Sequence, residues 1–253
     1  MLLKIKQLEK HFNGIKAVRD CDFIVDENKI VALIGPNGSG KTTVFNLITG
    51  LVKPDKGDIH FKGEPIIGLQ PYQIARLGIS RTFQLIRLFP KLTAMENLLL
   101  AKHREGENFL STILKPKHIK HEEKANRERC LEFLELVDLE DKSNSHAESL
   151  SYGQQKLLEI ARVLATESDL LLLDEPVSGI NPIMREKIKD ILIKLKKEGK
   201  TILFIEHDMR FVIDIADKVV VMDHGEEIAI GTPKQIQKNP KVLQAYLGKK
   251  VKL

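Results

Sequence analysis

The sequence predicts an α/β fold built on a parallel β-sheet, and three apolar runs are the basis for this prediction. Residues 30–34 precede a glycine-rich loop and then a stretch with helical spacing. Residues 170–173 and 201–205 are each followed by acidic residues. Continuous apolar runs of this length are typical of strands buried on both faces of a parallel sheet. Because ligands bind beyond the carboxyl ends of such strands, we expect function at the residues that follow these runs.

The composition is that of an ordinary globular protein. The chain has 253 residues, of which 42% are apolar and 30% charged, enough for one large domain or two small ones. No apolar run approaches the roughly 18 residues of a membrane span, and the first residues lack the apolar core of a signal peptide. Two cysteines are too few for a disulfide framework, which fits a reducing cytosol. The net charge of +5 comes from lysines scattered among acidic residues, which indicates solvated helix faces rather than a nucleic-acid surface.

The loop after the first apolar run has the pattern of a phosphate-binding loop. Residues 35–43 read Gly-Pro-Asn-Gly-Ser-Gly-Lys-Thr-Thr, and the strand before them and helix after them disfavour a mere helix-capping turn. Glycines let backbone N–H groups curl around an anion, and the helix N-terminus adds its positive dipole end. Lys41 is expected to reach the β- and γ-phosphates, while the Thr42 hydroxyl binds Mg²⁺. We therefore expect a nucleoside triphosphate to be held by Asn37, Gly38, Ser39, Gly40, Lys41, Thr42 and Thr43.

Two later apolar runs place chemistry-bearing side chains at strand ends. Asp174 and Glu175 follow four leucines, and two carboxylates that leave a buried strand are hard to explain as solvated surface. We expect Asp174 to hold Mg²⁺ through water, and Glu175 to orient or deprotonate the attacking water. His207 follows the 201–205 run in the same way, and a neutral imidazole there can donate to a γ-phosphate oxygen.

The first 84 residues contain several short strand patterns. Residues 3–8 and 21–25 alternate like strands, and residues 10–14 between them are predicted as a turn. Phe12 in that turn is either half-buried packing or a flat surface for a nucleobase, and its spacing does not decide between them. Further elements are expected as a strand at 58–63, a short helix at 73–77 and a strand at 78–84. Gln84 at its end could give an oxygen to the metal or position a water.

Residues 85–165 predict a helical subdomain inserted into the α/β core. A helix at 92–103 has Thr93 as its expected N-cap and Glu96 three residues later. Residues 109–121 are predicted as a loop or broken helix, and 122–137 as an amphipathic helix. His118 and His121 lack partner ligands at metal-binding spacing, so we interpret both as exposed polar residues.

Residues 150–155, Leu-Ser-Tyr-Gly-Gln-Gln, open another predicted helix. A Ser and a Gly at a helix N-terminus can bind a second anion, but local pattern alone favours an ordinary capped helix. The remaining chain predicts helices at 183–198, 211–217 and 235–247, the last as one or two helices. A strand, turn and strand are expected at 219–222, 223–225 and 226–230.

The order and separations of these motifs resemble the nucleotide-binding domain of ATP-binding-cassette (ABC) proteins across nearly the whole chain. This resemblance implies a RecA-like P-loop NTPase core, together with an N-terminal antiparallel β subdomain, formed by residues 1–84 and 166–235. Residues 85–165 would be a helical subdomain inserted in this core, and residues 236–253 a helical tail. The resemblance also implies that Phe12 stacks on adenine and that His207 is the switch histidine. Gln84 would be the Q-loop residue, a metal ligand and part of the catalytic set with Lys41, Glu175 and His207. Ser151, Gly153 and Gln154 would contact the nucleotide of a partner subunit.

A narrower resemblance is to the ATP-binding subunits of branched-chain amino acid importers, in particular the larger of that system's two. In such proteins the stretch at 150–154 is called the signature motif, and here it has Tyr152 in place of the commoner Gly. The narrower resemblance is carried by this Tyr152, by Arg-Thr-Phe-Gln at 81–84, by the insertion at 109–121, by Ile-Glu-His-Asp-Met at 205–209 and by Ala-Tyr-Leu-Gly at 245–248. Urea or amide importers and the lipopolysaccharide-export ATPase share much of this pattern. Asn181 departs from the Asp that is usual in the wider superfamily.

The resemblance implies an ATPase in which a head-to-tail dimer, of this chain with itself or with a sister ATPase, encloses two ATP molecules with Mg²⁺. Integral membrane permease subunits would carry the solute across the membrane. This chain would lie at the cytoplasmic face of that membrane, and an extracytoplasmic solute-binding protein would be an indirect partner. We expect Leu88 and Phe89, within 84–100, to contact a permease or to close the subdomain's own core. No nucleic-acid partner is expected. The competing interpretations are a soluble ABC ATPase acting on nucleic acid or ribosomes and a metabolic kinase.

Overall fold

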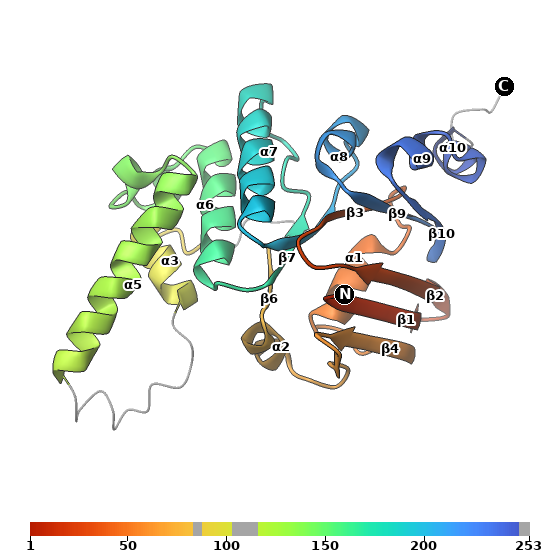
Figure 1. Cartoon of the computed structure of the whole chain (residues 1–253), viewed down its shortest axis with the longest axis horizontal. Helices are drawn as coiled ribbons and strands as arrows, with labels where there is room; N and C mark the ends of the chain where they lie inside the picture. Colours follow the sequence, from red (N-terminus) through yellow and green to blue (C-terminus); the bar gives the residue numbers. More distant parts are fainter. Residues whose placement is uncertain (83–87, 103–115, 248–253) are drawn as a thin grey trace. The chain divides into compact units, whose positions relative to one another are not determined.

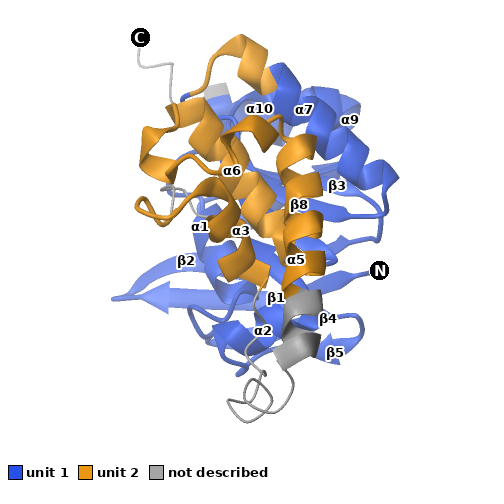
Figure 2. Cartoon of the chain, turned by 90° about the vertical axis from the view of Figure 1, so that its left-hand side faces the viewer, with its two compact units in different colours: residues 1–81, 169–179, 186–253 blue, residues 82–168, 180–185 orange. Residues whose placement is uncertain are grey.

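The computed structural model describes residues 1–82, 88–102 and 116–247. The chain forms two compact units, which Figure 2 shows in blue and orange. Unit 1 comprises residues 1–81, 169–179 and 186–253, and unit 2 comprises residues 82–168 and 180–185. Unit 2 is therefore inserted into the chain of unit 1, and a short later segment returns to it.

The main sheet of unit 1 has six strands in the order β10-β9-β3-β8-β7-β6 (Figure 1). Every neighbouring pair is parallel except β9 and β10, which confirms the predicted α/β class. All residues of β3, β7 and β8 are buried, as their apolar sequences require. The strands are β3 (Ile30–Ile34), β6 (Ile79–Arg81), β7 (Leu170–Asp174), β8 (Thr201–Ile205), β9 (Lys218–Asp223) and β10 (Glu226–Gly231).

The register of the central strands brings three loops to one edge of this sheet. Leu33 in β3 and Asp174 in β7 both pair with Ile205, the last residue of β8. The segments that follow these strands begin at the phosphate loop, at Glu175 and at Glu206. The predicted functional residues of unit 1 therefore leave the sheet side by side.

A second, antiparallel sheet in unit 1 has the order β2-β1-β4-β5. Its strands are β1 (Leu3–Phe12), β2 (Ile15–Val25), β4 (Lys56–Phe61) and β5 (Glu64–Pro65). The predicted turn at 10–14 is wrong, because β1 continues to Phe12 and only Asn13 and Gly14 turn. Backbone pairing of Lys10 with Val18 extends both strands where the side chains no longer alternate. The predicted strand at 58–63 likewise begins earlier and ends at Phe61.

The helices of unit 1 differ from their predicted bounds mainly at their capped ends. They are α1 (Lys41–Ile48), α2 (Pro71–Leu77), α7 (Pro182–Lys197, whose first residues belong to unit 2), α8 (Met209–Ile215), α9 (Pro233–Gln237) and α10 (Pro240–Leu247). The expected start of a helix at 211 is wrong, because the Asp208 carboxylate accepts from the Arg210 N–H and begins α8 at Met209. Similarly, Gln70 and Gln73 form a capping box that starts α2 at Pro71. The predicted strand at 78–84 is three residues long in the structure, β6.

Unit 2 contains α3 (Ala94–Lys102), α5 (Pro116–Leu136) and α6 (Tyr152–Ala165), which pack against one another. The predicted cap of α3 is confirmed: the Thr93 N–H donates to Glu96 at 2.8 Å and the Glu96 N–H donates to the Thr93 hydroxyl at 3.2 Å. Of the two alternatives predicted for 109–121, a loop or a broken helix, residues 116–121 are helical, because Pro116 fits the first turn of α5. Residues 109–115, and the side chains of His118 and His121, lie outside the described residues. Among the helices that the structure describes, none has the length and hydropathy that a membrane span requires.

Candidate nucleotide-binding site

The phosphate loop takes a shape that only glycine permits at two positions. Gly35 has φ +152°, and a Cβ built there would lie 2.1 Å from the Met222 carbonyl oxygen of β9. Gly40 has φ +103°, and its Cβ would lie 2.4 Å from the Ala17 carbonyl oxygen of β2. The Gly225 N–H, in the turn after β9, donates to the Ser39 carbonyl at 3.1 Å. The loop is therefore held from behind by backbone of β2, β9 and the β9–β10 turn.

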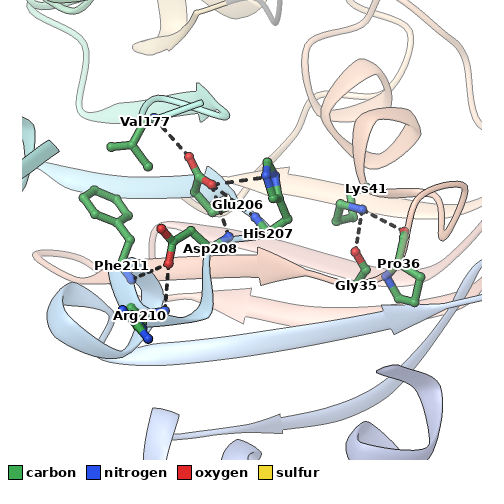
Figure 3. A network of polar contacts seen from close by, with 9 residues as sticks. All are labelled: Gly35, Pro36, Lys41, Val177, Glu206, His207, Asp208, Arg210 and Phe211. Carbon is green, nitrogen blue, oxygen red and sulfur yellow. Dashed lines mark hydrogen bonds and ion pairs between the residues drawn. The ribbon is translucent and has the colours of Figure 1, made fainter. Parts of the chain in front are cut away.

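Lys41, the first residue of α1, turns back over this loop. Its Nζ donates to the carbonyl oxygens of Gly35 and Pro36, both at 2.9 Å (Figure 3). Burial lowers the pKa of Lys41, while the nearby carboxylates of Glu175 and Asp174 act in the opposite direction. The structure thus brings the predicted phosphate-binding lysine within electrostatic reach of both predicted acids.

A pocket of about 320 Å³ opens beside the loop. Five predicted residues line it: Gly38, Gly40, Lys41, Thr42 and Thr43. The other wall, which sequence reasoning missed, is formed by Ile15, Lys16, Ala17, Arg19 and His224. No local motif marks these residues, because only the pairing of β2 and the position of the β9–β10 turn bring them to the loop. The pocket can accommodate a phosphorylated ligand beside the loop N–H groups.

Three predicted nucleotide contacts are not part of this lining. Ser39 is buried, with its hydroxyl 3.4 Å from Lys41 Nζ. Asn37 lies in the loop but does not line the pocket. Phe12 is 43% exposed at the end of β1, with Lys10 Nζ 5.5 Å from its ring centroid. An exposed ring of this kind is accessible to a base, so adenine stacking on Phe12 stays a prediction.

The two acids at the end of β7 have different surroundings. Asp174 is buried, and its carboxylate accepts from the Arg81 guanidinium at 2.9 Å. Glu175 has φ +50°, which is uncommon for a residue with a side chain, and its N–H donates to the Ile205 carbonyl at 3.0 Å. Backbone strain of this kind is often stored at functional sites. Here it redirects the chain at the point where the sheet ends.

Mg²⁺ fits the oxygen donors that the described residues offer, although these residues form no cage of protein ligands. Within residues 1–82, 88–102 and 116–247, no group of three or more His, Cys, Asp or Glu side chains is arranged to hold a metal. Mg²⁺ does not need such a cage, because it keeps several waters and binds through one or two carboxylates together with phosphate oxygens. The Asp174 carboxylate and the Thr42 hydroxyl are oxygen donors of the required kind. Gln84, the third predicted ligand, lies outside the described residues.

Glu206 organises the end of β8, a role that the sequence did not reveal. Its buried carboxylate accepts from the Val177 N–H at 3.0 Å and from the His207 N–H at 3.1 Å (Figure 3). Burial raises the pKa of Glu206, against the lowering effect of these hydrogen bonds. The predicted switch histidine is largely exposed, with its Nδ1 3.9 Å from Glu206 Oε2. One carboxylate therefore connects the segment after β7 to the backbone that carries His207.

The second predicted anion site lies in unit 2, at the start of α6. Ser151 is its N-cap: the Gln154 N–H donates to the Ser151 hydroxyl at 3.4 Å and the Ser151 N–H donates to Gln154 Oε1 at 3.0 Å. A Cβ on Gly153 would come within 3.2 Å of Met184. Asn181 caps α7, because its Oδ1 accepts from the Met184 N–H at 2.9 Å. These contacts describe a capped helix, and a role toward a partner's nucleotide stays a prediction.

The fold and site define a P-loop nucleotide-binding protein, since the strand–loop–helix phosphate site stands on a parallel sheet with acids at the neighbouring strand ends. The chain belongs to the ABC transporter family, whose model matches residues 18–178. A second model, described as branched-chain amino acid ATP-binding cassette transporter, matches residues 226–252. The family predicted from the sequence is thus confirmed.

Curated relatives and solved structures agree with this assignment. The chain is 45% identical, over 98% of both chains, to the high-affinity branched-chain amino acid transport ATP-binding protein BraF of Pseudomonas aeruginosa. It is 42% identical, over 98% of both chains, to LivG of Escherichia coli, which carries the same description. A nucleotide-free ATP-binding cassette from an ABC transporter superposes with a TM-score of 0.85 at 34% identity, over 97% of this chain and 98% of that one. The ADP conformation of an ABC transporter cassette gives a TM-score of 0.85 at 35% identity, over 98% of both.

Proposed function

We propose that this chain is the ATP-binding and ATP-hydrolysing subunit of an importer for branched-chain amino acids. The observation that carries the proposal is that the phosphate loop with Lys41 and the two acids, Asp174 and Glu175, follow strands that end side by side, since Leu33 of β3 and Asp174 of β7 both pair with Ile205. Phosphoryl transfer to water requires a phosphate cradle, a metal ligand and a group that orients the water, and these residues supply all three. The solute class is supported by the descriptions of BraF and LivG and by the family match at 226–252.

Each residue has a defined task in this proposal. Lys41 exchanges its two carbonyl acceptors for the β- and γ-phosphate oxygens, which are stronger, charged acceptors. Glu175, whose backbone has φ +50° directly after β7, orients and deprotonates the attacking water. His207 donates to the γ-phosphate from the end of β8.

Mg²⁺ neutralises charge on the β- and γ-phosphates when it is bound with ATP. Thr42 would hold it through its hydroxyl, Asp174 through a bound water and Gln84 through its side-chain oxygen. The fit rests on the oxygen donors described above, the Thr42 hydroxyl and the Asp174 carboxylate.

We infer that the working unit is a head-to-tail dimer of cassettes. Ser151 and Tyr152 at the start of α6 are exposed, so this helix N-terminus is accessible to an anion from another molecule. A dimeric ABC cassette is among the structural neighbours, with a TM-score of 0.76 at 28% identity over 92% of this chain and 99% of that one. Ser151, Gly153 and Gln154 would close over the partner's ATP, and loss of the γ-phosphate would reopen the dimer because only ATP favours the closed state.

The solute would pass through other chains. We infer that permease subunits bind this chain at the cytoplasmic face of the membrane. An extracytoplasmic solute-binding protein delivers the amino acid to these permease subunits. Phe89 and Leu100 are exposed on unit 2, at 47% and 46%, and large apolar side chains of this kind are typical of protein interfaces. Replacing Phe89 with Ser should uncouple transport while sparing basal ATPase activity.

The ATPase proposal is tested with two variants. Glu175→Gln keeps the shape of the side chain but cannot accept a proton, so it should bind ATP normally and hydrolyse it roughly 100-fold or more slowly. Lys41→Ala should weaken ATP binding itself, because the loop loses its charge-assisted donor. Isothermal titration calorimetry and phosphate release separate the two effects. Near wild-type hydrolysis by Glu175→Gln would contradict the role of Glu175.

The importer proposal is tested by capture from membranes. Tagged Glu175→Gln, saturated with ATP and Mg²⁺, is added to detergent-solubilised native membranes and recovered. Co-purification of multi-span membrane proteins, followed by ATP-dependent leucine uptake into proteoliposomes containing them and wild-type ATPase, is the expected result. Recovery of ribosomes or nucleic acid without membrane proteins would overturn the importer assignment.

A further inference from the structure

The end of β6 carries a buried arginine that the proposed mechanism does not use. Arg81 Nη2 donates to Asp174 Oδ2 at 2.9 Å, and Arg81 Nη1 donates to Asn46 Oδ1 at 2.7 Å. The guanidinium also lies over the Phe45 ring, with 5.2 Å between Cζ and the ring centroid. The Arg81 side chain is 6% exposed and that of Asp174 is 2% exposed. The guanidinium is thus fixed on three sides by residues of two other elements.

Stability alone does not explain this arrangement. A buried ion pair gives up the hydration of both charges, and well-packed apolar residues in its place are often as stable or more stable. A buried pair does, however, hold its two groups in one geometry, since each is unfavourable without the other. Arginine suits this task better than lysine, because its planar fork can reach two acceptors in fixed directions.

The two acceptors belong to the segments that carry the proposed Mg²⁺ ligands. Asp174 is itself one of these ligands. Asn46 lies on α1, four residues after Thr42, so the two side chains share one face of the helix. Arg81 therefore joins the helix that presents the Thr42 hydroxyl to the strand that presents the Asp174 carboxylate.

We propose that Arg81, held by Asn46, is a positioning residue for the Mg²⁺ site, which fixes the Asp174 carboxylate relative to α1. The inference rests on the proposed function, since it concerns the metal that accompanies ATP. Groups that orient a metal ligand from behind typically change metal affinity about 10–100-fold when they are replaced. Arg81→Lys keeps the positive charge but loses the fork, and Asn46→Ala leaves the ion pair but removes the second anchor. Both variants should weaken metal binding without weakening metal-free nucleotide binding.

The test measures the metal directly. Mn²⁺ replaces Mg²⁺ in oxygen-donor sites and is counted by electron paramagnetic resonance, here with the non-hydrolysable analogue AMP-PNP bound. Arg81→Lys should raise the apparent Kd of Mn²⁺ about 10–100-fold, and Asn46→Ala should raise it about threefold to tenfold. The affinity for AMP-PNP in EDTA, from calorimetry, should stay within about twofold of wild type because the phosphate loop does not contain these residues.

A matched control breaks another ion pair next to β7. Lys62 Nζ lies 2.6 Å from Asp169, which directly precedes the strand. Lys62→Met should leave the Mn²⁺ affinity unchanged. Unchanged Mn²⁺ affinity in Arg81→Lys would overturn the inference. A loss of AMP-PNP affinity in EDTA as large as the loss of Mn²⁺ affinity would also overturn it. If Arg81→Lys does not fold, Asn46→Ala is judged by the same two measurements. Failure of the wild type to bind AMP-PNP would instead contradict the proposed function.

Discussion

An alanine at Gly35 would place its methyl carbon 2.1 Å from the Met222 carbonyl oxygen and 2.7 Å from the Ser39 hydroxyl. The carbonyl cannot move aside easily, because β9 is paired with β3 on one side and β10 on the other. Backbone strain of roughly 1–3 kcal/mol and overpacking of about 1–3 kcal/mol give an expected loss of about 2–6 kcal/mol in the free energy of unfolding. That is a large part of the roughly 5–15 kcal/mol that stabilises a typical domain.

A matched variant separates the clash from the backbone strain. Gly63 also has positive φ, +86°, but a Cβ there would meet no atom within 4 Å. Gly63→Ala should therefore lose only the strain contribution, about 1–3 kcal/mol. Urea unfolding followed by far-ultraviolet circular dichroism gives both values, which suits a chain without tryptophan. ATP binding should be weakened in Gly35→Ala and unchanged in Gly63→Ala.

If Gly35→Ala loses no more stability than Gly63→Ala and binds ATP like the wild type, the contact with Met222 does not constrain the loop. A small stability loss combined with weak ATP binding would instead mean that the loop relieves the clash by leaving its phosphate-binding shape. Both measurements are therefore needed for each variant.

Three further predictions concern two buried side chains, those of Glu206 and Cys21, and the exposed cap residue Asn181. Burial raises the pKa of Glu206 above its ordinary 4.5, so the folded protein binds this proton more tightly than the unfolded chain, and stability falls as pH rises from 4.5 to the raised value. Glu206→Gln should remove that slope in urea unfolding between pH 4 and 8, and an identical slope in both proteins would contradict the interpretation. Burial, aided by nearby acids, raises the pKa of Cys21 to about 12, so Ellman's reagent at pH 8 should label Cys21 only after unfolding. Rapid labelling of Cys21 in the native protein would contradict the raised pKa. Asn181→Ala should lose about 0.5–2 kcal/mol of unfolding free energy with the α7 cap, and Asn181→Asp, which keeps the acceptor, should not.

Features that depend on neighbouring residues in the chain were predictable from the sequence. The phosphate loop follows from the glycine spacing between a strand and a helix, and the cap formed by Thr93 and Glu96 follows from their separation. The buried strands before Asp174 and Glu206 were evident from continuous apolar runs. Each of these patterns is decided within about ten residues, where local sterics and burial dominate.

Features that depend on long-range contacts were not predictable in this way. β1 and β2 are longer than their alternation indicated, because pairing between the strands compensates for polar side chains. The Glu206 carboxylate reaches Val177, 29 residues away, and Arg81 reaches Asp174, 93 residues away. Only the order of strands in the sheet brings such residues together. The acidic and basic residues were visible in the sequence, but their partners were not.

The contacts between the phosphate loop and β9 bear on how the protein is synthesised. The phosphate loop is translated early. The Met222 carbonyl and the Gly225 N–H, which lie against the back of the loop, are translated nearly 200 residues later, at roughly 5–20 residues per second. Domains generally fold as units, so the nascent chain has the complete phosphate-binding motif long before it has the strand that shapes it. Competence to bind ATP should therefore arrive late, in one step, when β9 joins the sheet. Truncated or stalled chains that carry every residue of the motif should therefore be unable to bind ATP.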